Sequence, residues 1–406
     1  SFTASADGSS KSEAIASAAG GKADSSSSAD KQGDKAAGLA NKQSGGSKSI
    51  GKSASTDDGA GGGGSVSVGA ALALNVASSV ADASISGVTI IAGDGAGTGA
   101  LNLKSENNMD ASAIADGSAA TGADTKDKDG KSTGTTVGIG IALNIANMQN
   151  HATVGAGTTV TADGVSAQAL MKDVGGDKTH KFAAKATSGA SGGDTGVAGS
   201  FALNYSKAQT EAGLTTALTV DAGAGDVTIS AANTTDAQVE AKASAKSGST
   251  GVGVSVGLNI AVDNDTRAVI ADGTTLTGGD DVTLTATGSH VVNTTAEGGG
   301  TAKDGTGVGG ALALTVADNA TEARIGTGTG LDVTGAVSAT ANHHGSSTTT
   351  AKGDATGTST AVGVALALGF VDDSAIATTG RDITADGAVS FTASADGSSK
   401  SEAIAS

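Results

Sequence analysis

The stretch "VGVSVGLNIAV", residues 252–262, alternates strictly between large and small side chains. Its large residues are valine, leucine and isoleucine, and the intervening residues are glycine, serine, asparagine and alanine. Because successive side chains of a β-strand point to opposite faces, this alternation predicts a strand with one bulky apolar face and one nearly bare face.

Five further stretches share the alternation, and an aligned position near the end of each copy recurs every 54 to 69 residues. Turns rich in Gly, Asp and Asn and shorter segments such as "DVTLTATG" follow each copy, and we interpret "DND" at residues 263–265 as one such turn. A repeat of about 55 residues cannot bury an apolar face alone, so neighbouring copies must stack. The sequence therefore predicts an all-β fold, an elongated β-solenoid or β-helix-like rod of six repeats. The aligned positions are Asn75, Asn144, Asn204, Asn259, Thr315 and Gly369.

The two faces of the repeated strand have different expected environments. The bulky face carries core-forming residues, so we expect it to build a continuous core between stacked repeats. The bare face predicts close approach by another layer of backbone, which we favour, or a narrow interior that excludes large groups. Stacking would also place Asn75, Asn144, Asn204 and Asn259 in one row, where their amides either form a hydrogen-bonded ladder or are merely tolerated at a strand end.

Residues Ser1–Ser17, "SFTASADGSSKSEAIAS", recur identically as Ser390–Ser406, a displacement of 389 residues. We infer that residues 1–406 form one continuous array, an excerpt of a tandem super-repeat of 389 residues. The two identical segments should share one conformation, six strand spacings apart if each repeat is one wide coil and twelve if it is two narrow coils. We predict wide coils, with antiparallel hairpins as the alternative. Polar inserts at 22–64 and 121–134 are predicted to be loops.

Composition narrows the classes of partner. The net charge of −17 argues against nucleic acid and against anionic membrane surfaces. The chain contains no cysteine for disulfides and no run of about 18 apolar residues for a membrane span. The complete absence of proline fits strands whose backbone N–H groups are nearly all needed for pairing.

No convergent set of catalytic residues is recognisable, so we expect no enzyme activity. The adjacent His343 and His344 would point to opposite faces of a strand, which spoils shared metal coordination, and we interpret them as a surface turn. We expect no cofactor, with weak Ca²⁺ binding by acidic turns as the alternative, since the same residues are common in turns for local hydrogen bonding. The candidate Ca²⁺ ligands are Asp127, Asp129, Asp263, Asp265, Asp280 and Asp281.

The "DVTLTA"-like segments, the Gly-Asp turns and the strands of the "VGVALAL" type resemble the repeats of large bacterial filamentous adhesins, of the filamentous-haemagglutinin type and related giant surface proteins. The resemblance covers all six repeats and implies a secreted β-solenoid rod at the cell surface, with no catalytic residues to carry over. The expected function is a structural extracellular fibre or stalk for adhesion, cell connection or matrix. The expected partners are further copies in tandem, laterally associated fibres, and a host or neighbouring cell surface. The alternative is a ligand-binding β-solenoid for Ca²⁺, glycan or ice.

Overall fold

The computed structural model describes residues 1–20, 66–93, 97–121 and 133–406. The predicted polar insert 22–64 lies outside the described residues, and so do residues 122–132 of the predicted insert 121–134.

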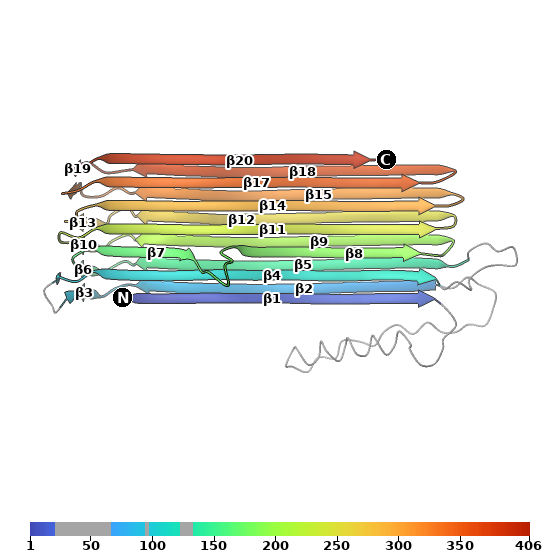
Figure 1. Cartoon of the computed structure of the whole chain (residues 1–406), viewed down its shortest axis with the longest axis horizontal. Helices are drawn as coiled ribbons and strands as arrows, with labels where there is room; N and C mark the ends of the chain where they lie inside the picture. The colour runs from blue at the N-terminus through green and yellow to red at the C-terminus, as the bar shows by residue number, and fades with distance from the viewer. Residues whose placement is uncertain (21–65, 94–96, 122–132) are drawn as a thin grey trace, which may run out of the picture.

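The described chain is an all-β solenoid, as the sequence predicts. Each of its six coils contains a long strand of one sheet, a three-residue strand, and a long strand of a second sheet, which is interrupted at residues 172–179 in the second coil. One more long strand precedes the first coil. Figure 1 shows the long strands stacked side by side, from β1 at one edge to β20 at the other. Each repeat is therefore one wide coil.

The strands form one six-stranded sheet, one eight-stranded sheet and two small sheets. The six-stranded sheet contains β2 (Val66–Ile85), β5 (Thr135–Val154), β9 (Thr195–Leu214), β12 (Thr250–Ile270), β15 (Thr306–Ile325) and β18 (Thr360–Thr379). The eight-stranded sheet contains β1 (Phe2–Gly20), β4 (Leu101–Thr121), β7 (Val165–Met171), β8 (His180–Ser191), β11 (Val227–Ser247), β14 (Val282–Ala302), β17 (Val337–Thr356) and β20 (Val389–Ala405). The short strands are β3 (Thr89–Ile91), β6 (Thr159–Thr161), β10 (Thr219–Asp221), β13 (Thr275–Thr277), β16 (Leu331–Val333) and β19 (Ile383–Ala385).

Successive copies of the repeated strand lie side by side in register, so that Asn144 pairs with Asn75 on one side and with Asn204 on the other. The hairpin alternative is wrong, because every pairing between named strands of the described chain is parallel. The interpretation of "DND" as a turn is also wrong. Strand β12 continues through it, with a bulge between Ala261 and Asn264 where Asp263 adopts a φ of 53°.

The bare face of the repeated strand points into the solenoid and is buried. A Cβ built on Gly253 would lie 2.1 Å from the carbonyl oxygen of Gly299 in the opposite sheet, and one built on Gly138 would lie 2.1 Å from the carbonyl oxygen of Gly189. The prediction that another layer of backbone approaches this face is confirmed. The same approach makes the interior too narrow for large side chains.

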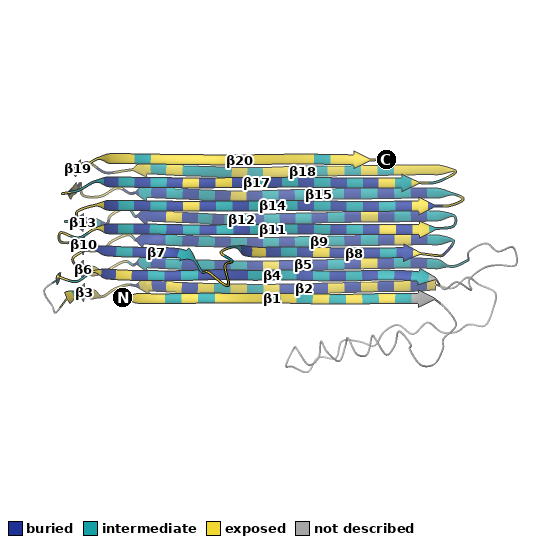
Figure 2. Ribbon diagram, viewed as in Figure 1, coloured by how far each residue is buried: buried dark blue, intermediate teal, exposed yellow. Residues whose placement is uncertain are grey.

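The prediction that the bulky face forms the core is wrong. Val252, Val254 and Val256 point outward and are half-buried or exposed, because the space beside the inward-facing glycines of this half of β12 accepts only small side chains. Figure 2 shows the resulting alternation of buried and less buried residues along the inner strands. Large buried apolar side chains gather instead mainly where the long strands meet the short ones, and a smaller cluster of Met109, Met148 and Phe182 lies between the two long sheets. The larger cluster includes Leu103, Leu214, Ile229, Ile270, Leu276 and Leu284.

The close approach of the sheets can be tested with one methyl group. We expect Gly253→Ala to lower the free energy of unfolding by about 1–3 kcal/mol, because the added Cβ overlaps a backbone oxygen that only a sheet displacement can move. Gly199→Ala in β9 is the matched control. A Cβ on this outward-facing glycine has nothing within 4 Å, so that variant should be neutral or slightly stabilised. Equal urea-unfolding midpoints for both variants would contradict the packing described.

Candidate functional site

The outward face of the six-stranded sheet carries a continuous apolar surface, which we call the apolar panel. It consists of five rows of residues that run across all six strands, with one residue of each strand in each row. It contains no charged residue. The panel comprises the even-numbered residues 68–76 of β2, the odd-numbered residues 137–145 of β5 and 197–205 of β9, and the even-numbered residues 252–260 of β12, 308–316 of β15 and 362–370 of β18.

Large side chains of the panel are accessible even on strands that have neighbours on both sides. Ile139 and Ile145 of β5 are 38% and 40% exposed, and Val254 of β12 is 44% exposed. The exposure of these side chains is not caused by a position at the edge of the sheet, since β5 and β12 are inner strands. Contiguous apolar surface of this kind marks an interaction site on a folded protein.

Charged residues begin in the row immediately beyond the panel. This row includes Lys207, Asp263, Asp318 and Asp372, and the Lys207 ammonium lies 2.5 Å from the Asp263 carboxylate. Burial, together with the charges of Asp372, Asp265 and Asp263, raises the pKa of the Asp318 carboxyl. The six-stranded sheet is therefore divided along its strands into an apolar half and a charged half.

The outward face of the eight-stranded sheet is polar by contrast. Ion pairs join its neighbouring strands, as between Lys185 and Glu240 at 3.0 Å and between Lys352 and Glu297 at 3.4 Å. Lys242 lies between Glu240 and Glu297 and contacts both. Exposed pairs of this kind contribute little to stability individually, but they keep the face hydrated and in register.

Inside the solenoid, Asn75, Asn144, Asn204 and Asn259 form a chain of side-chain hydrogen bonds that runs along the stack. Each amide nitrogen donates to the amide oxygen of the next residue, at 2.8, 2.8 and 2.9 Å. The last nitrogen, on Asn259, donates to the backbone oxygens of Ala237 and Asn293. All four side chains are buried.

The coil with threonine at this position uses hydroxyl groups. The Thr315 hydroxyl lies 2.6 Å from that of Thr294 and accepts a hydrogen bond of 2.7 Å from Thr349, both of which belong to the opposite sheet. At Gly369, in the last coil, a Cβ would lie 2.8 Å from the Ser401 hydroxyl. The side chains of the internal row are thus polar in five coils, and the last coil has glycine in their place.

A second internal chain contains one of the two adjacent histidines. Asn264 donates to Asn319 at 2.8 Å, Asn319 donates to Asp373 at 2.8 Å, and the His343 Nε2 lies 3.0 Å from the same Asp373 oxygen. His343 is buried, whereas the side chain of His344 is 56% exposed. The two rings do point to opposite faces, as predicted, but the interpretation as a surface turn is wrong because both lie within β17.

Two further histidines, His180 and His290, are fully buried on the inward side of the eight-stranded sheet. The His180 Nδ1 accepts a 2.9 Å hydrogen bond from the backbone N–H of Met109, at the break between β7 and β8, and the His290 Nδ1 lies 2.8 Å from the Thr235 hydroxyl. Burial lowers the pKa of each imidazole to about 3. Both rings are therefore neutral in the folded protein near pH 7.

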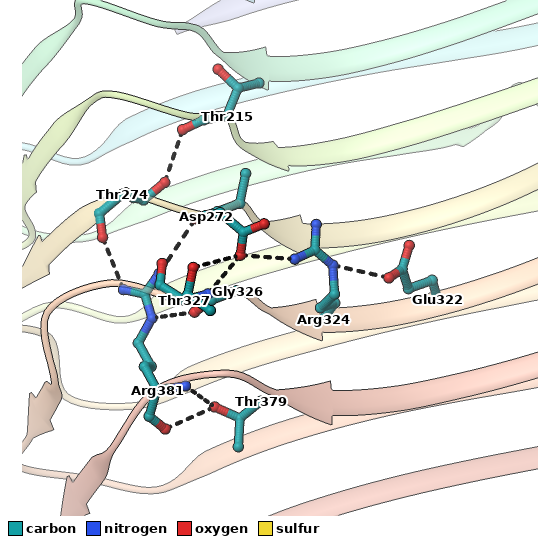
Figure 3. Close-up of polar contacts among 10 residues, drawn as sticks. Thr215, Asp272, Thr274, Glu322, Arg324, Gly326, Thr327, Thr379 and Arg381 are labelled. Atoms are coloured by element: carbon teal, nitrogen blue, oxygen red, sulfur yellow. Dashed lines mark hydrogen bonds and ion pairs between the residues drawn. The ribbon is translucent and has the colours of Figure 1, made fainter.

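An arginine clamps three successive coils where β18 ends. The Arg381 guanidinium donates to the backbone oxygens of Gly326, Thr274 and Thr327, at 2.6, 2.9 and 3.1 Å (Figure 3). Burial lowers the pKa of this guanidinium, and the charge of Asp272 opposes that shift. The arginine thus satisfies turn carbonyls that no strand partner reaches.

Asp272 extends the same polar network across the corner. Its carboxylate accepts hydrogen bonds from the Thr327 backbone N–H at 2.6 Å and from Arg324 at 3.2 Å, and Arg324 also pairs with Glu322 at 3.0 Å. The hydrogen bond from Thr327 is the main reason that the pKa of the Asp272 carboxyl is lowered. Beside this network lies a cavity of about 310 Å³, whose charged lining groups include Arg267 and Glu322, paired at 3.4 Å.

The candidate Ca²⁺ ligands that the structure describes lie in two separate places. Asp127 and Asp129 are outside the described residues, Asp263 and Asp265 lie at the bulge of β12, and Asp280 and Asp281 precede β14. The last two accept hydrogen bonds from the next coil, Asp280 from the Thr334 hydroxyl and Asp281 from the Ala336 N–H. No group of three or more His, Cys, Asp or Glu in the described part of the chain is arranged to hold a metal ion. Weak Ca²⁺ binding stays a prediction.

No protein-family model matches the chain, and no curated protein or solved structure is significantly similar to it. None of the described residues form a helix of the length and apolarity needed to cross a membrane.

The internal asparagine chain should be essential for stability. We expect Asn204→Ala to lower the free energy of unfolding by about 2–4 kcal/mol, because a buried donor on Asn144 and a buried acceptor on Asn259 both lose their partner. Asn147→Ala, on the outward face of β5, should change it by less than about 0.5 kcal/mol. Chemical denaturation of both variants measures the difference, and a loss of equal size at the two sites would refute the role given to the chain.

Because His180 and His290 are buried and neutral, we expect the free energy of unfolding to decrease at acidic pH. In the unfolded chain the imidazoles bind protons below about pH 6.5, whereas in the folded protein they do so only near pH 3. The unfolded state therefore binds more protons between these values, and the free energy of unfolding falls as the pH drops through this window. Each histidine lowers the free energy of unfolding by at most about 1.4 kcal/mol for every unit by which the pH falls.

Urea unfolding at about pH 7.5 and about pH 5.5 measures this acid effect. The decrease in stability should be smaller in His290→Gln than in the original chain, since one titrating group is gone. His344→Gln removes an exposed imidazole and should retain the full decrease. Identical decreases in all three proteins would show that the buried rings do not titrate as stated.

Proposed function

We propose that the chain is a segment of a structural extracellular fibre or stalk on a bacterial surface, which serves adhesion, cell connection or matrix building. The fibre lengthens by stacking further coils in tandem. Its action is mechanical and multivalent, because each coil repeats the same surfaces along the array. The resemblance of the repeats to those of filamentous adhesins supports the surface location.

The observation that carries the proposal is the register of the duplicated segment. β1 and β20 contain the two identical sequences and lie at opposite edges of one sheet. A single row of paired residues connects the first phenylalanine to its duplicate. The row runs through Phe2, Leu103, Ala167, Ile229, Leu284, Ala339 and Phe391.

The strand that begins a super-repeat thus recurs six strands later in the same sheet, with each residue in the same register. Parallel strands are about 4.8 Å apart, so each 389-residue unit advances the array by roughly 29 Å along the stacking direction. Both edge strands still have unpaired backbone groups on one side, and these groups can pair with the next coil of a longer array.

Tandem expression tests the fibre. Chains with one, two and three copies of the 389-residue unit should appear in electron micrographs as rods whose length along the stack grows in equal steps of roughly 29 Å. The width, set by strands of about 20 residues, should not change. Separate bodies joined by linkers, or unequal steps, would refute tandem stacking.

The surface location is tested on intact cells that produce the protein. Added protease should degrade the protein while a cytoplasmic marker in the same cells stays intact. Protection of the protein until the cells are lysed would refute the extracellular location, whatever the outcome of the length measurement.

A further inference from the structure

We propose that two copies of the chain pair face to face through their apolar panels, about a two-fold axis that is parallel to the stacking direction. The pairing needs only the stacked coils and does not depend on where the protein is located. It would make the working fibre a double rod.

The panel is large enough to form a stable interface. Five rows at two-residue intervals extend about 26 Å along the strands, and six strands extend about 29 Å across them, which gives roughly 750 Å² of flat area. A stable protein–protein interface buries about 800 Å² on each partner. One super-repeat therefore comes close to this size, and every added super-repeat enlarges the contact.

The stretches of sequence outside the described residues are poor in large apolar residues that could cover the panel. The stretch 21–65 contains only two large apolar residues, Leu39 and Ile50, and the stretch 122–132 contains none. The strands that are described have their own places in the stack. We therefore take a second copy of the panel, which is apolar along its whole length, as the covering surface.

The pattern of small and large side chains on the panel is complementary to itself. Its second row alternates small and large residues from coil to coil: Ala70, Ile139, Gly199, Val254, Gly310 and Val364. Its fourth row is leucine in every coil: Leu74, Leu143, Leu203, Leu258, Leu314 and Leu368. A two-fold axis through the third row, parallel to the stack, places the fourth row of one copy over the second row of the other. Leucines then meet the hollows left by Ala70, Gly199 and Gly310.

The same axis keeps charges out of the contact. The panel occupies the first half of each strand, so centring one panel on the other places the first charged row of each copy opposite the first residues of the partner's strands, and the remaining charged rows beyond those strands. Both copies also keep the same stacking direction and the same spacing between coils, so their rows stay in step over any length. A lipid surface would need neither the alternating row nor the matching period, and three carboxylates in the adjoining row disfavour anionic membranes.

Sedimentation of the full 406-residue chain over about 1–100 μM tests the pairing. The chain should sediment as a dimer at the upper concentrations. Val256→Asp, at the centre of the panel, should raise the dissociation constant at least about 100-fold, because the symmetry buries two carboxylates. Val291→Asp is the matched control on the outward face of β14 and should change it less than about threefold. Circular dichroism melting of both variants establishes that they are folded.

Single cysteines test the orientation, since the chain has none of its own. Val256 lies on the third row, so a short bis-maleimide reagent should link two Val256→Cys chains covalently within the dimer, while it should not link Val291→Cys chains. Any one of four results would overturn the proposal: a monomer at about 100 μM, a dimer insensitive to Val256→Asp, a dimer lost equally in both aspartate variants, or a dimer without the Val256→Cys cross-link. So would binding of the monomer to neutral phosphatidylcholine vesicles in place of dimerisation.

Discussion

The close contact between the backbones of the two long sheets determines the rest of the structure. At Gly253 and Gly138 the distance to the opposite carbonyl oxygen leaves no space even for a methyl group. Large side chains at these positions therefore have to face outward, and the larger apolar cluster lies near the short strands, with a smaller one around Met148 and Phe182 between the long sheets. Both the narrow interior and the exposed apolar panel follow from this one distance.

A narrow interior also changes how buried polar groups are satisfied. The amides of Asn144 and Asn204 find partners along the stack, in the neighbouring coils, at a spacing that parallel pairing fixes. The hydroxyls around Thr315 instead find them across the interior, in the opposite sheet. A coil is consequently complete only when its neighbours are present, which links local order to the continuity of the array.

The sequence predicted the features that recur and missed those that occur once. Alternation of side-chain size indicated the strands and their stacking, because all six copies carry it, and the lack of similarity between the repeated strand and the "DVTLTA"-like segments indicated the wide coil. The alternation could not tell which face is inside, since a bulky apolar face normally forms the core and only the distance between the sheets reverses this here. The internal asparagine row was recognisable because four copies share it. The Arg381 clamp, the buried His180 and the interruption at residues 172–179 each belong to a single coil, and no periodicity indicated them. "DND" was misread because the residues that favour turns also occur at a bulge.

The direction of the hydrogen bonds between coils gives the stack a particular response to force. These bonds lie along the stacking direction, so a pull on the two ends of the array loads them directly. The covalent chain, however, crosses from coil to coil only once per turn, and detachment can proceed one coil at a time from an end. Each released coil of about 55 residues frees up to roughly 190 Å of extended chain in place of one strand spacing. An array built this way would unfold one coil at a time under force. It would dissipate a sudden load before the covalent bonds that hold the chain at its ends are strained.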